Sequence, residues 1–247
     1  MAIQAVSGGR TQKRTRRRKK HKWLRRLTPV LWFLALFAAA VLLSIVAFRF
    51  INPPFTPLMA AEKLRGATLR RDWVPLEEMS PQLPLAVISS EDGRFCAHWG
   101  VDWSAVREAI REGGGLASVR GASTIPMQTA KNLYLWSGRS FVRKALEVPL
   151  AYAMSIVWPK ERMMEVYLNI AQFGPGVFGV EAASRYYFKK SAAHLTRHEA
   201  VLLAVTLPNP RFRNPAKPNR RLRLVAQVVE RRMPSMASRA ACVLPSP

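Results

Sequence analysis

The stretch AVISSEDGRFCAHWG, residues 86–100, places two adjacent carboxylates directly after an apolar run. A carboxylate beside apolar residues loses part of its hydration, and this loss raises its pKa toward the range that suits general acid–base chemistry. The pair Asp92-Gly93 is also typical of a solvated turn. Glu91 and Asp92 are therefore either turn residues or an acid–base pair at the end of a buried segment.

A metal site is a third interpretation of this stretch. It would use four oxygen and nitrogen donors: Glu91, Asp92, His98 and Asp102. These donors do not follow a recognised ligand spacing, and His98 could equally fix the loop by a hydrogen bond. The chain has two cysteines, Cys96 and Cys242, and no CxxC pair, so one disulfide is possible and a zinc signature is absent. We expect both cysteines to be structural or incidental.

The charge of the chain is strongly basic and unevenly distributed. Its 247 residues carry a formal net charge of +24, and the first 61 residues contain neither Asp nor Glu. A basic balance of this size suggests an anionic partner such as phosphate, a membrane surface or nucleic acid. Hydrophobic residues make up 49% of the chain, which is enough for a packed core.

An uncharged apolar run, residues 29–48, follows the basic N-terminal cluster. A helix of this length spans about 30 Å, the hydrocarbon thickness of a bilayer. The positive-inside rule then keeps the N-terminus cytoplasmic and places the rest of the chain outside the cytoplasm. A cleaved signal peptide is the alternative, although its apolar region usually has only about 7–15 residues. We predict a basic cytoplasmic tail at 1–28 and one transmembrane helix at 29–50.

The position of the basic tail bears on its partner. Beside a membrane span, such a tail sets topology and contacts anionic lipid headgroups more often than it binds nucleic acid. We therefore expect a membrane partner and no nucleic acid.

The rest of the chain shows mainly helical patterns. The Pro-rich NPPFTP cannot continue a helix, so we predict a membrane-proximal linker at 51–72 and a folded domain at 73–240. Asp102 is a predicted N-cap, and Thr196 with Glu199 forms a predicted capping box. Strand signals are scarce, which predicts a mainly α fold. The expected helices cover residues 102–113, 125–135, 138–158, 160–173, 180–188 and 196–208.

Four basic residues surround Glu147 in the sequence: Lys131, Arg139, Arg143 and Lys144. Basic side chains three or four positions apart on a helix usually form a solvated face. Arginine and lysine together can also clamp a pyrophosphate leaving group and neutralise its charge as it develops. Taken alone, this pattern leaves both interpretations open.

The segment RGASTIPMQTAKN, residues 120–132, places two hydroxyls ahead of a predicted helix. Ser123 and Thr124 could present hydroxyl and backbone N–H groups to phosphate, or they could simply cap the helix. The segment is not a P-loop, because the pattern GxxxxGK[ST] is absent. The chain also lacks a GxSxG elbow and an HExxH motif, so nucleophilic serine catalysis has no support.

The order of these motifs resembles the peptidoglycan glycosyltransferase family, whose members polymerise lipid II. The pattern ED-x-x-F-x-x-H-x-G is met by Glu91, Asp92, Phe95, His98 and Gly100. R-K-x-x-E is met by Arg143, Lys144 and Glu147, and K-x-x-x-x-E-x-Y-L-N by Lys160, Glu165, Tyr167, Leu168 and Asn169. The similarity covers roughly residues 75–210, and we expect no second catalytic domain. The chain therefore resembles the monofunctional, single-span members of Gram-negative bacteria.

The resemblance implies a lysozyme-like helical glycosyltransferase domain held at the bacterial inner membrane, with the catalytic domain in the periplasm. It implies that Glu91 is the general base and that Glu147 assists at the leaving group. Lys131 and Arg139 would hold the donor pyrophosphate. The implied substrate-binding set is Asp92, His98, Ser123, Thr124, Gln128, Lys131, Asn132, Arg139, Arg143 and Lys144.

The resemblance also implies the partners of the reaction. These are lipid II and the growing glycan chain, and proteins of cell-wall synthesis or division are compatible with them. A divalent cation, Mg²⁺ or Mn²⁺, could assist the pyrophosphate, but no metal ligands are assigned. The donor needs no nucleotide.

One departure from the family pattern concerns the residue before Gln128. The family usually has Gln-Gln after S-T-I-x, whereas this chain has Met127-Gln128. Two alternative functions follow from the same residues. One is a lysozyme-like hydrolase or lytic transglycosylase, which would share the catalytic Glu but has no need of a pyrophosphate clamp. The other is a non-catalytic scaffold of the cell-wall machinery.

Overall fold

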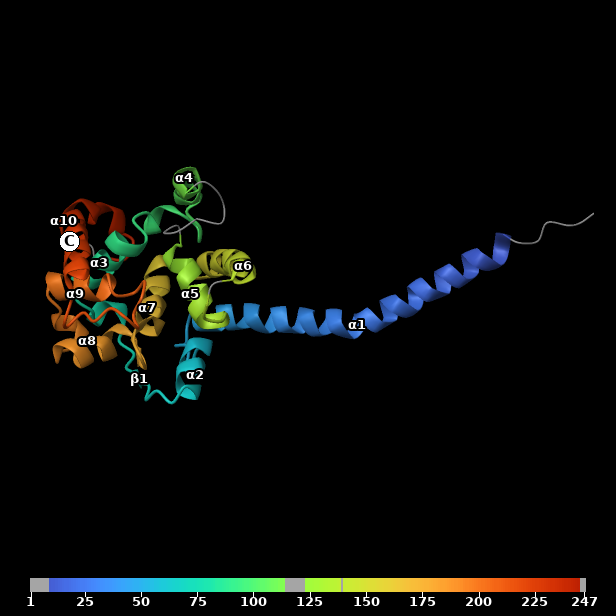
Figure 1. The fold of residues 1–247 in the computed structure, drawn as a ribbon, viewed down its shortest axis with the longest axis horizontal. Helices are drawn as coiled ribbons and strands as arrows, with labels where there is room; N and C mark the ends of the chain where they lie inside the picture. The colour runs from blue at the N-terminus through green and yellow to red at the C-terminus, as the bar shows by residue number, and fades with distance from the viewer. Residues whose placement is uncertain (1–8, 114–122, 139, 245–247) are drawn as a thin grey trace, which may run out of the picture. The chain divides into compact units, whose positions relative to one another are not determined.

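The computed structural model describes residues 9–113, 123–138 and 140–244, with side chains described from Thr28 onward (Figure 1). The chain divides into two units, residues 1–46 and 47–247. The first unit consists of most of α1 (Gly9–Phe48). The part of α1 from Thr28 to Phe48, 21 residues, is long and apolar enough to cross a membrane. This helix begins earlier than the span predicted from hydropathy and ends close to the predicted position.

The second unit is built from nine helices in the described residues and has one small sheet. The sheet has the order β1-β3-β2, in which β3 pairs parallel with β1 and antiparallel with β2. This composition confirms the predicted mainly α fold. The helices are α2 (Pro57–Leu64), α3 (Gln82–Glu91), α4 (Trp103–Gly113), α5 (Ile125–Tyr134), α6 (Phe141–Val157), α7 (Lys160–Ile170), α8 (Val180–Phe188), α9 (Arg197–Ala204) and α10 (Arg220–Met236). The strands are β1 (Arg70–Arg71), β2 (Gln172–Gly174) and β3 (Val177–Phe178), and the short 3-10 turns are η1 (Leu76–Glu78), η2 (Phe95–Ala97), η4 (Ala192–His194) and η5 (Ser238–Ala240).

Two groups of packed helices form the core of the domain. α3 packs against α9 and α10, and α5 packs against α6 and α7. α3 contributes Leu83, Ala86, Val87 and Ile88, all fully buried. The apolar run at residues 86–88 is therefore the last part of a core helix, and this helix carries Glu91 as its final residue.

Side-chain caps fix where several helices begin. The Asp102 carboxylate accepts hydrogen bonds from the backbone N–H groups of Ser104 and Ala105, at 3.0 and 3.1 Å. Thr196 and Glu199 form a complete capping box at the start of α9. Both predicted caps are confirmed. Each satisfies backbone donors that a helix start leaves without an intrahelical partner.

Arginine side chains fasten the chain segment that follows α1. Arg162 donates to the carbonyl oxygens of Phe48 and Ile51 at 3.0 and 2.7 Å. Arg71 donates to the carbonyl oxygens of Pro53 and Pro54, each at 2.5 Å. The segment predicted as a linker also contains α2, whose residue Met59 is buried. Much of the segment is therefore folded onto the domain.

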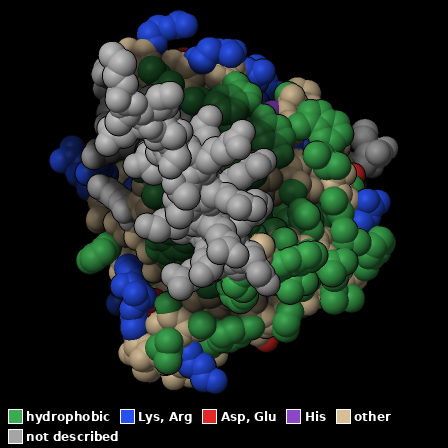
Figure 2. Space-filling model, turned by 90° about the vertical axis from the view of Figure 1, so that its right-hand side faces the viewer, with side chains coloured by type: hydrophobic (Ala, Val, Ile, Leu, Met, Phe, Trp, Pro, Cys, Tyr) green, Lys and Arg blue, Asp and Glu red, His purple; other side chains and the backbone are tan. Residues whose placement is uncertain are grey.

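α6 keeps an apolar surface outside the core. Phe141, Val142, Leu146 and Ile156 are exposed on this helix. Figure 2 shows that hydrophobic side chains gather over a broad part of one face of the molecule. An exposed apolar surface of this kind indicates contact with another apolar phase or partner.

A disulfide joins Cys96 in η2 to Cys242, which follows η5, with an S–S distance of 2.00 Å. The two residues are 146 positions apart in the sequence. The cysteines are therefore structural, one of the two alternatives expected from the sequence. The bond links the segment after α3 to the C-terminal side of α10.

Candidate active site

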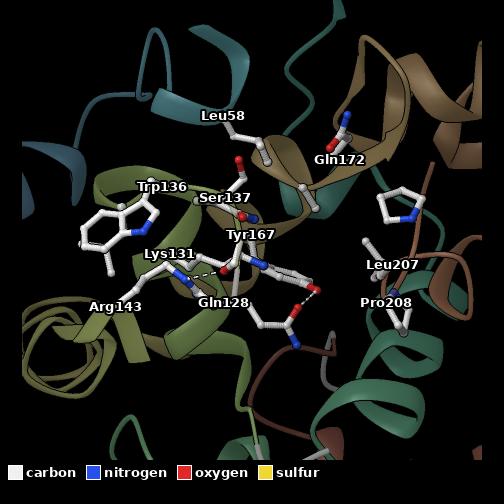
Figure 3. A pocket seen from close by; sticks show the side chains of 15 residues that line it. Leu58, Gln128, Lys131, Trp136, Ser137, Arg143, Tyr167, Gln172, Leu207 and Pro208 are labelled. Atoms are coloured by element: carbon white, nitrogen blue, oxygen red, sulfur yellow. Dashed lines mark hydrogen bonds between the residues drawn. The ribbon is translucent and has the colours of Figure 1, made fainter. Parts of the chain in front are cut away.

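A cavity of about 410 Å³ opens between α2, α5, α7 and the segment after α9. Figure 3 shows Gln128, Lys131 and Tyr167 on one side of it, and Leu207 with Pro208 on another. Polar and charged side chains therefore share this cavity with apolar ones, which is the usual composition of a ligand site.

Glu91 lies beside this cavity, next to its lining residue Gln128. The Gln128 Nε2 donates to Glu91 Oε2 at 3.0 Å, and the Ser90 hydroxyl donates to Oε1 at 3.2 Å. Burial raises the pKa of Glu91, while Gln128, Ser90 and the positive charges of Arg213 and Lys131 oppose that rise. The result is a carboxyl group that binds a proton more readily than an exposed glutamate, as a general base requires.

Tyr167 lies behind Gln128 and is fully buried. Its hydroxyl donates to Gln128 Oε1 at 2.9 Å, the contact drawn between these side chains in Figure 3. Burial raises the phenolic pKa well above its usual value, and the nearby charges of Glu91 and Asp92 raise it further. The phenol therefore stays protonated and remains a hydrogen-bond donor.

A group of basic side chains, Lys131, Arg143 and Lys144, forms what we call the cationic wall. Lys131 and Arg143 line the cavity. Burial lowers the pKa of Lys131; the charge of Glu147 counteracts this, and those of Arg143 and Lys144 add to it. A lysine in this environment is stabilised by an anion, because the anion restores the favourable interaction lost on burial.

Glu147 is buried beneath the cationic wall, with 1% of its surface exposed. Its Oε1 is ion-paired with Arg143, and its Oε2 lies 3.3 Å from Lys144 Nζ. Arg143 also donates from Nε to the Gly138 carbonyl oxygen at 3.0 Å. Both carboxylate oxygens of Glu147 are thus engaged, and the residue is placed to orient the two cations.

Asp92 faces the protein interior, unlike Glu91. Its Oδ2 accepts a hydrogen bond from the backbone N–H of Ile125 at 2.9 Å. His98 Nε2 lies 2.9 and 3.0 Å from its two carboxylate oxygens. Lys160 Nζ donates to the carbonyl oxygens of Phe95 and His98, at 2.5 and 2.6 Å. We call Asp92, His98 and Lys160 the buried ionic cluster.

The hydroxyls predicted to meet phosphate are placed differently from one another. Thr124 is buried, donates to the Gly100 carbonyl oxygen at 2.5 Å and caps α5 by accepting from the Met127 N–H. Ser123 is half-buried, and its carbonyl oxygen lies 3.4 Å from Gln128 Nε2. Neither residue lines the cavity described above, so the capping interpretation fits Thr124.

The remaining positions considered in the sequence have three different outcomes. Asn132 is buried and lines the cavity. Arg139 lies outside the described residues. Met127 is 2% exposed and packs with Val101 and Ala151 in a small apolar cluster. Met127, the residue that departs from the family's Gln-Gln, therefore packs in the core. Gln128 lies beside Glu91.

Two residues near Glu91 were missing from the predicted site. Tyr167 belonged to a recognised motif, and its polar tip in a buried helix was a signal that could have identified it. Arg213 lies on the segment after α9, where its guanidinium donates to the Val205 carbonyl oxygen at 2.5 Å. No sequence pattern connects it with Glu91, because the tertiary fold alone brings them together.

Comparison with known proteins shows the family to which the chain belongs. The family described as Transglycosylase matches residues 59–234. A biosynthetic peptidoglycan transglycosylase of Agrobacterium fabrum is 51% identical over 204 residues, which are 83% of this chain and 90% of that protein. Proteins of the same name from Brucella suis and Pasteurella multocida are 45% and 46% identical, over 90% and 81% of this chain and 99% and 84% of their own lengths. The chain therefore belongs to the transglycosylase family and is a glycosyltransferase of peptidoglycan synthesis.

Proposed function

We propose that this chain polymerises lipid II by inverting transfer of the growing glycan chain, with Glu91 as the general base. The observation that carries the proposal is the pairing of two unlike features at one cavity. A carboxyl group whose pKa is raised by burial lies beside the cavity, and two residues of the cationic wall, Lys131 and Arg143, line it. A glycosyl transfer from a pyrophosphate donor needs both.

The proposed reaction begins at Glu91. Its carboxylate takes the proton from the 4-hydroxyl of the GlcNAc of the acceptor lipid II. The hydroxyl oxygen attacks C1 of the donor sugar, and the bond from C1 to the polyprenyl pyrophosphate breaks. The α-linked donor thereby becomes a β-1,4 product, with the base on one face of the sugar and the leaving group on the other, as in inverting glycosidases.

The cationic wall serves the leaving group in this proposal. The pyrophosphate gains negative charge as the C1–O bond breaks, and pre-positioned cations stabilise that charge. Lys131 and Arg143 line the cavity where this group would lie. Because Glu147 is already ion-paired with Arg143 and Lys144, we assign it a positioning role rather than proton transfer.

The described residues contain no ready-made cluster of metal ligands. Among them, no group of three or more His, Cys, Asp or Glu side chains could hold a metal ion. The charged side chains that line the cavity, Lys131 and Arg143, are both cations, whereas Mg²⁺ is usually held by one or two carboxylates together with substrate phosphates. The mechanism above therefore contains no step that passes through a metal.

We further propose a single-pass location in the bacterial inner membrane, with a cytoplasmic N-terminus and a periplasmic catalytic domain. The apolar Thr28–Phe48 segment and the basic residues before it support this topology. The Cys96–Cys242 disulfide supports it independently, because disulfides persist in the periplasm and not in the cytoplasm.

The cationic wall also favours a transferase over a lysozyme-like hydrolase. Hydrolysis of finished glycan releases no pyrophosphate, so the buried ion pairs that orient Arg143 and Lys144 would have no purpose there. The test uses the full chain in detergent with labelled lipid II. We expect a polymer that a muramidase digests. Cleavage of finished glycan without polymer formation would identify a hydrolase. If the chain forms no polymer and cleaves no glycan while a control polymerase is active, a non-catalytic scaffold is the remaining interpretation.

A further inference from the structure

We propose that Tyr167 is a positioning residue for the reaction and that it acts through Gln128 to hold Glu91 in the orientation and charge state of a general base. The inference rests on the proposed role of Glu91. The three side chains come from three helices, α7, α5 and α3, which meet beside the cavity. The hydrogen bonds that join them run from Tyr167 to Gln128 and from Gln128 to Glu91.

The orientation of the Gln128 amide is the central element of this chain. A glutamine amide accepts hydrogen bonds at its oxygen and donates them at its nitrogen. The Tyr167 hydroxyl donates to Oε1 at 2.9 Å, and this contact directs Nε2 toward Glu91 Oε2 at 3.0 Å. If the amide turned over, its oxygen would face the carboxylate, and two acceptors would meet without a proton between them.

Tyr167 is suited to select one orientation of the Gln128 amide. It is fully buried, and its burial together with the charges of Glu91 and Asp92 keeps the phenolic pKa well above its usual value. The phenol therefore retains its proton throughout the range in which Glu91 changes charge. A donor that never ionises holds Oε1 of Gln128 toward itself, which leaves the nitrogen for Glu91.

The Gln128 hydrogen bond influences the charge state of Glu91. Among the groups that lower its pKa, the Gln128 hydrogen bond has the largest effect, followed by Ser90 and the charges of Arg213 and Lys131. These charged groups act on Glu91 from the segment after α9 and from α5, and Asp92 is its neighbour in sequence. Without the Gln128 donor, fewer interactions would oppose the rise in the Glu91 pKa that burial causes. The carboxyl would therefore keep its proton to higher pH.

The test compares Tyr167→Phe with a matched control, Tyr187→Phe, in the full chain. The Tyr187 hydroxyl is partly buried and donates to a backbone carbonyl oxygen, that of Phe173, at 3.2 Å. For Tyr167→Phe we expect kcat to fall about three- to tenfold, the size of one ordinary hydrogen bond, with the KM for lipid II unchanged. The acid limb of the pH profile should move up by about 0.5–1 unit. Tyr187→Phe should leave that limb in place.

A double-mutant cycle separates action through Gln128 from a merely structural effect. In the Gln128→Leu background the amide is absent, so Tyr167→Phe should move neither kcat nor the acid limb further. An equal effect of Tyr167→Phe in both backgrounds would overturn the proposal, as would an unmoved acid limb in the single variant. If Tyr167→Phe does not fold, 3-fluorotyrosine at position 167 keeps the hydroxyl and strengthens it as a donor. The limb should then move to lower pH, and an unmoved limb would again overturn the proposal.

A measurement without turnover distinguishes this inference from the proposed function. The carboxyl carbon of Glu91 can be titrated by NMR in ¹³C-glutamate-labelled full chain, with Glu91→Gln as the assignment control. A higher Glu91 pKa in Tyr167→Phe supports the relay even if wild-type protein forms no polymer, in which case the proposed function alone fails. An unchanged Glu91 pKa in an active enzyme rejects the relay alone.

Discussion

Glu91 and Asp92 are adjacent in sequence, yet the two regions around them differ in almost every physical respect. Glu91 lies beside the cavity and receives hydrogen bonds from two neutral side chains. Asp92 lies in the buried ionic cluster, where a backbone N–H, an imidazole and the charge of Lys160 compensate it. The Glu91 carboxylate therefore lies at the cavity where the proposed reaction needs a base, whereas both oxygens of the Asp92 carboxylate contact groups inside the fold.

The largest effect is expected from Glu91→Gln, which removes the base and keeps the shape. Polymerisation should fall by about 10²–10⁴-fold, the usual contribution of a general base. Stability should not fall with it. Because the folded state raises the pKa of Glu91, its ionisation costs stability as pH rises above the ordinary value, and this cost persists at neutral pH. Glutamine carries no such cost, so the melting temperature at pH 7 should stay equal or rise.

The polymerisation rate and the melting temperature of Glu91→Gln test what the comparison says about Glu91. Retained turnover in Glu91→Gln would remove the residue from the role of base. A lower melting temperature would show that its carboxylate stabilises the fold, as that of Asp92 does.

Lys131→Met tests whether the reactive region needs a cation across the cavity. Lys131 lines the cavity, and loss of one group that stabilises developing charge typically costs about 10²–10³-fold in kcat. Lys217, which is exposed, provides a matched Lys→Met control that should retain activity. Equal rates for the two variants would contradict the role given to the cationic wall.

Asp92→Asn tests the second half of the comparison. It removes a buried charge that faces His98 and the Ile125 N–H. We expect a loss of about 1.5–3 kcal/mol in the free energy of unfolding, measured by denaturant titration. Asp72→Asn, at an exposed position, should stay within about 0.5 kcal/mol of wild type. A similar small change in Asp92→Asn would mean that the cluster does not stabilise the fold.

The smallest effect concerns the charge environment of Glu91. A base is active when deprotonated, so kcat/KM should fall as pH falls through the pKa of Glu91, which burial raises above that of an exposed glutamate. Arg213→Gln removes a positive charge that lowers this pKa, and the midpoint should rise by less than about 0.5 unit. Arg220→Gln, at an exposed site, is the control. A wild-type midpoint at or below the pKa of an exposed glutamate would contradict the desolvation of Glu91.

The sequence predicted much of the helical fold but only part of the site. The start of α5 was correctly expected near Ile125, and that of α7 at Lys160, because caps and apolar spacing are local signals. α10 was not identified, although its buried residues Leu222, Ala226 and Val229 follow a helical spacing among many arginines.

The contacts of the site depend on distant parts of the chain. Gln128 is 37 residues from Glu91 and 39 from Tyr167, and local patterns carry no information about such distances. For the same reason the residue pattern alone did not separate Glu91 from Asp92, and only the family resemblance named Glu91 as the base. Both were assigned to the site, whereas the direction of each side chain is set by where α3 ends against α5.

The disulfide has a consequence for the order in which the molecule matures. Cys96 and Cys242 are the two cysteines of the chain, and 146 residues separate them. If the chain emerges at the pace of synthesis, Cys96 waits roughly 7–30 s for its partner. During that interval oxidation within one molecule is impossible, and the available error is a covalent pair of two copies. If the domain is exported as proposed, closure of the bond shows that translocation has passed Cys242, and crosslinked dimers are one sign of export that stalls before it.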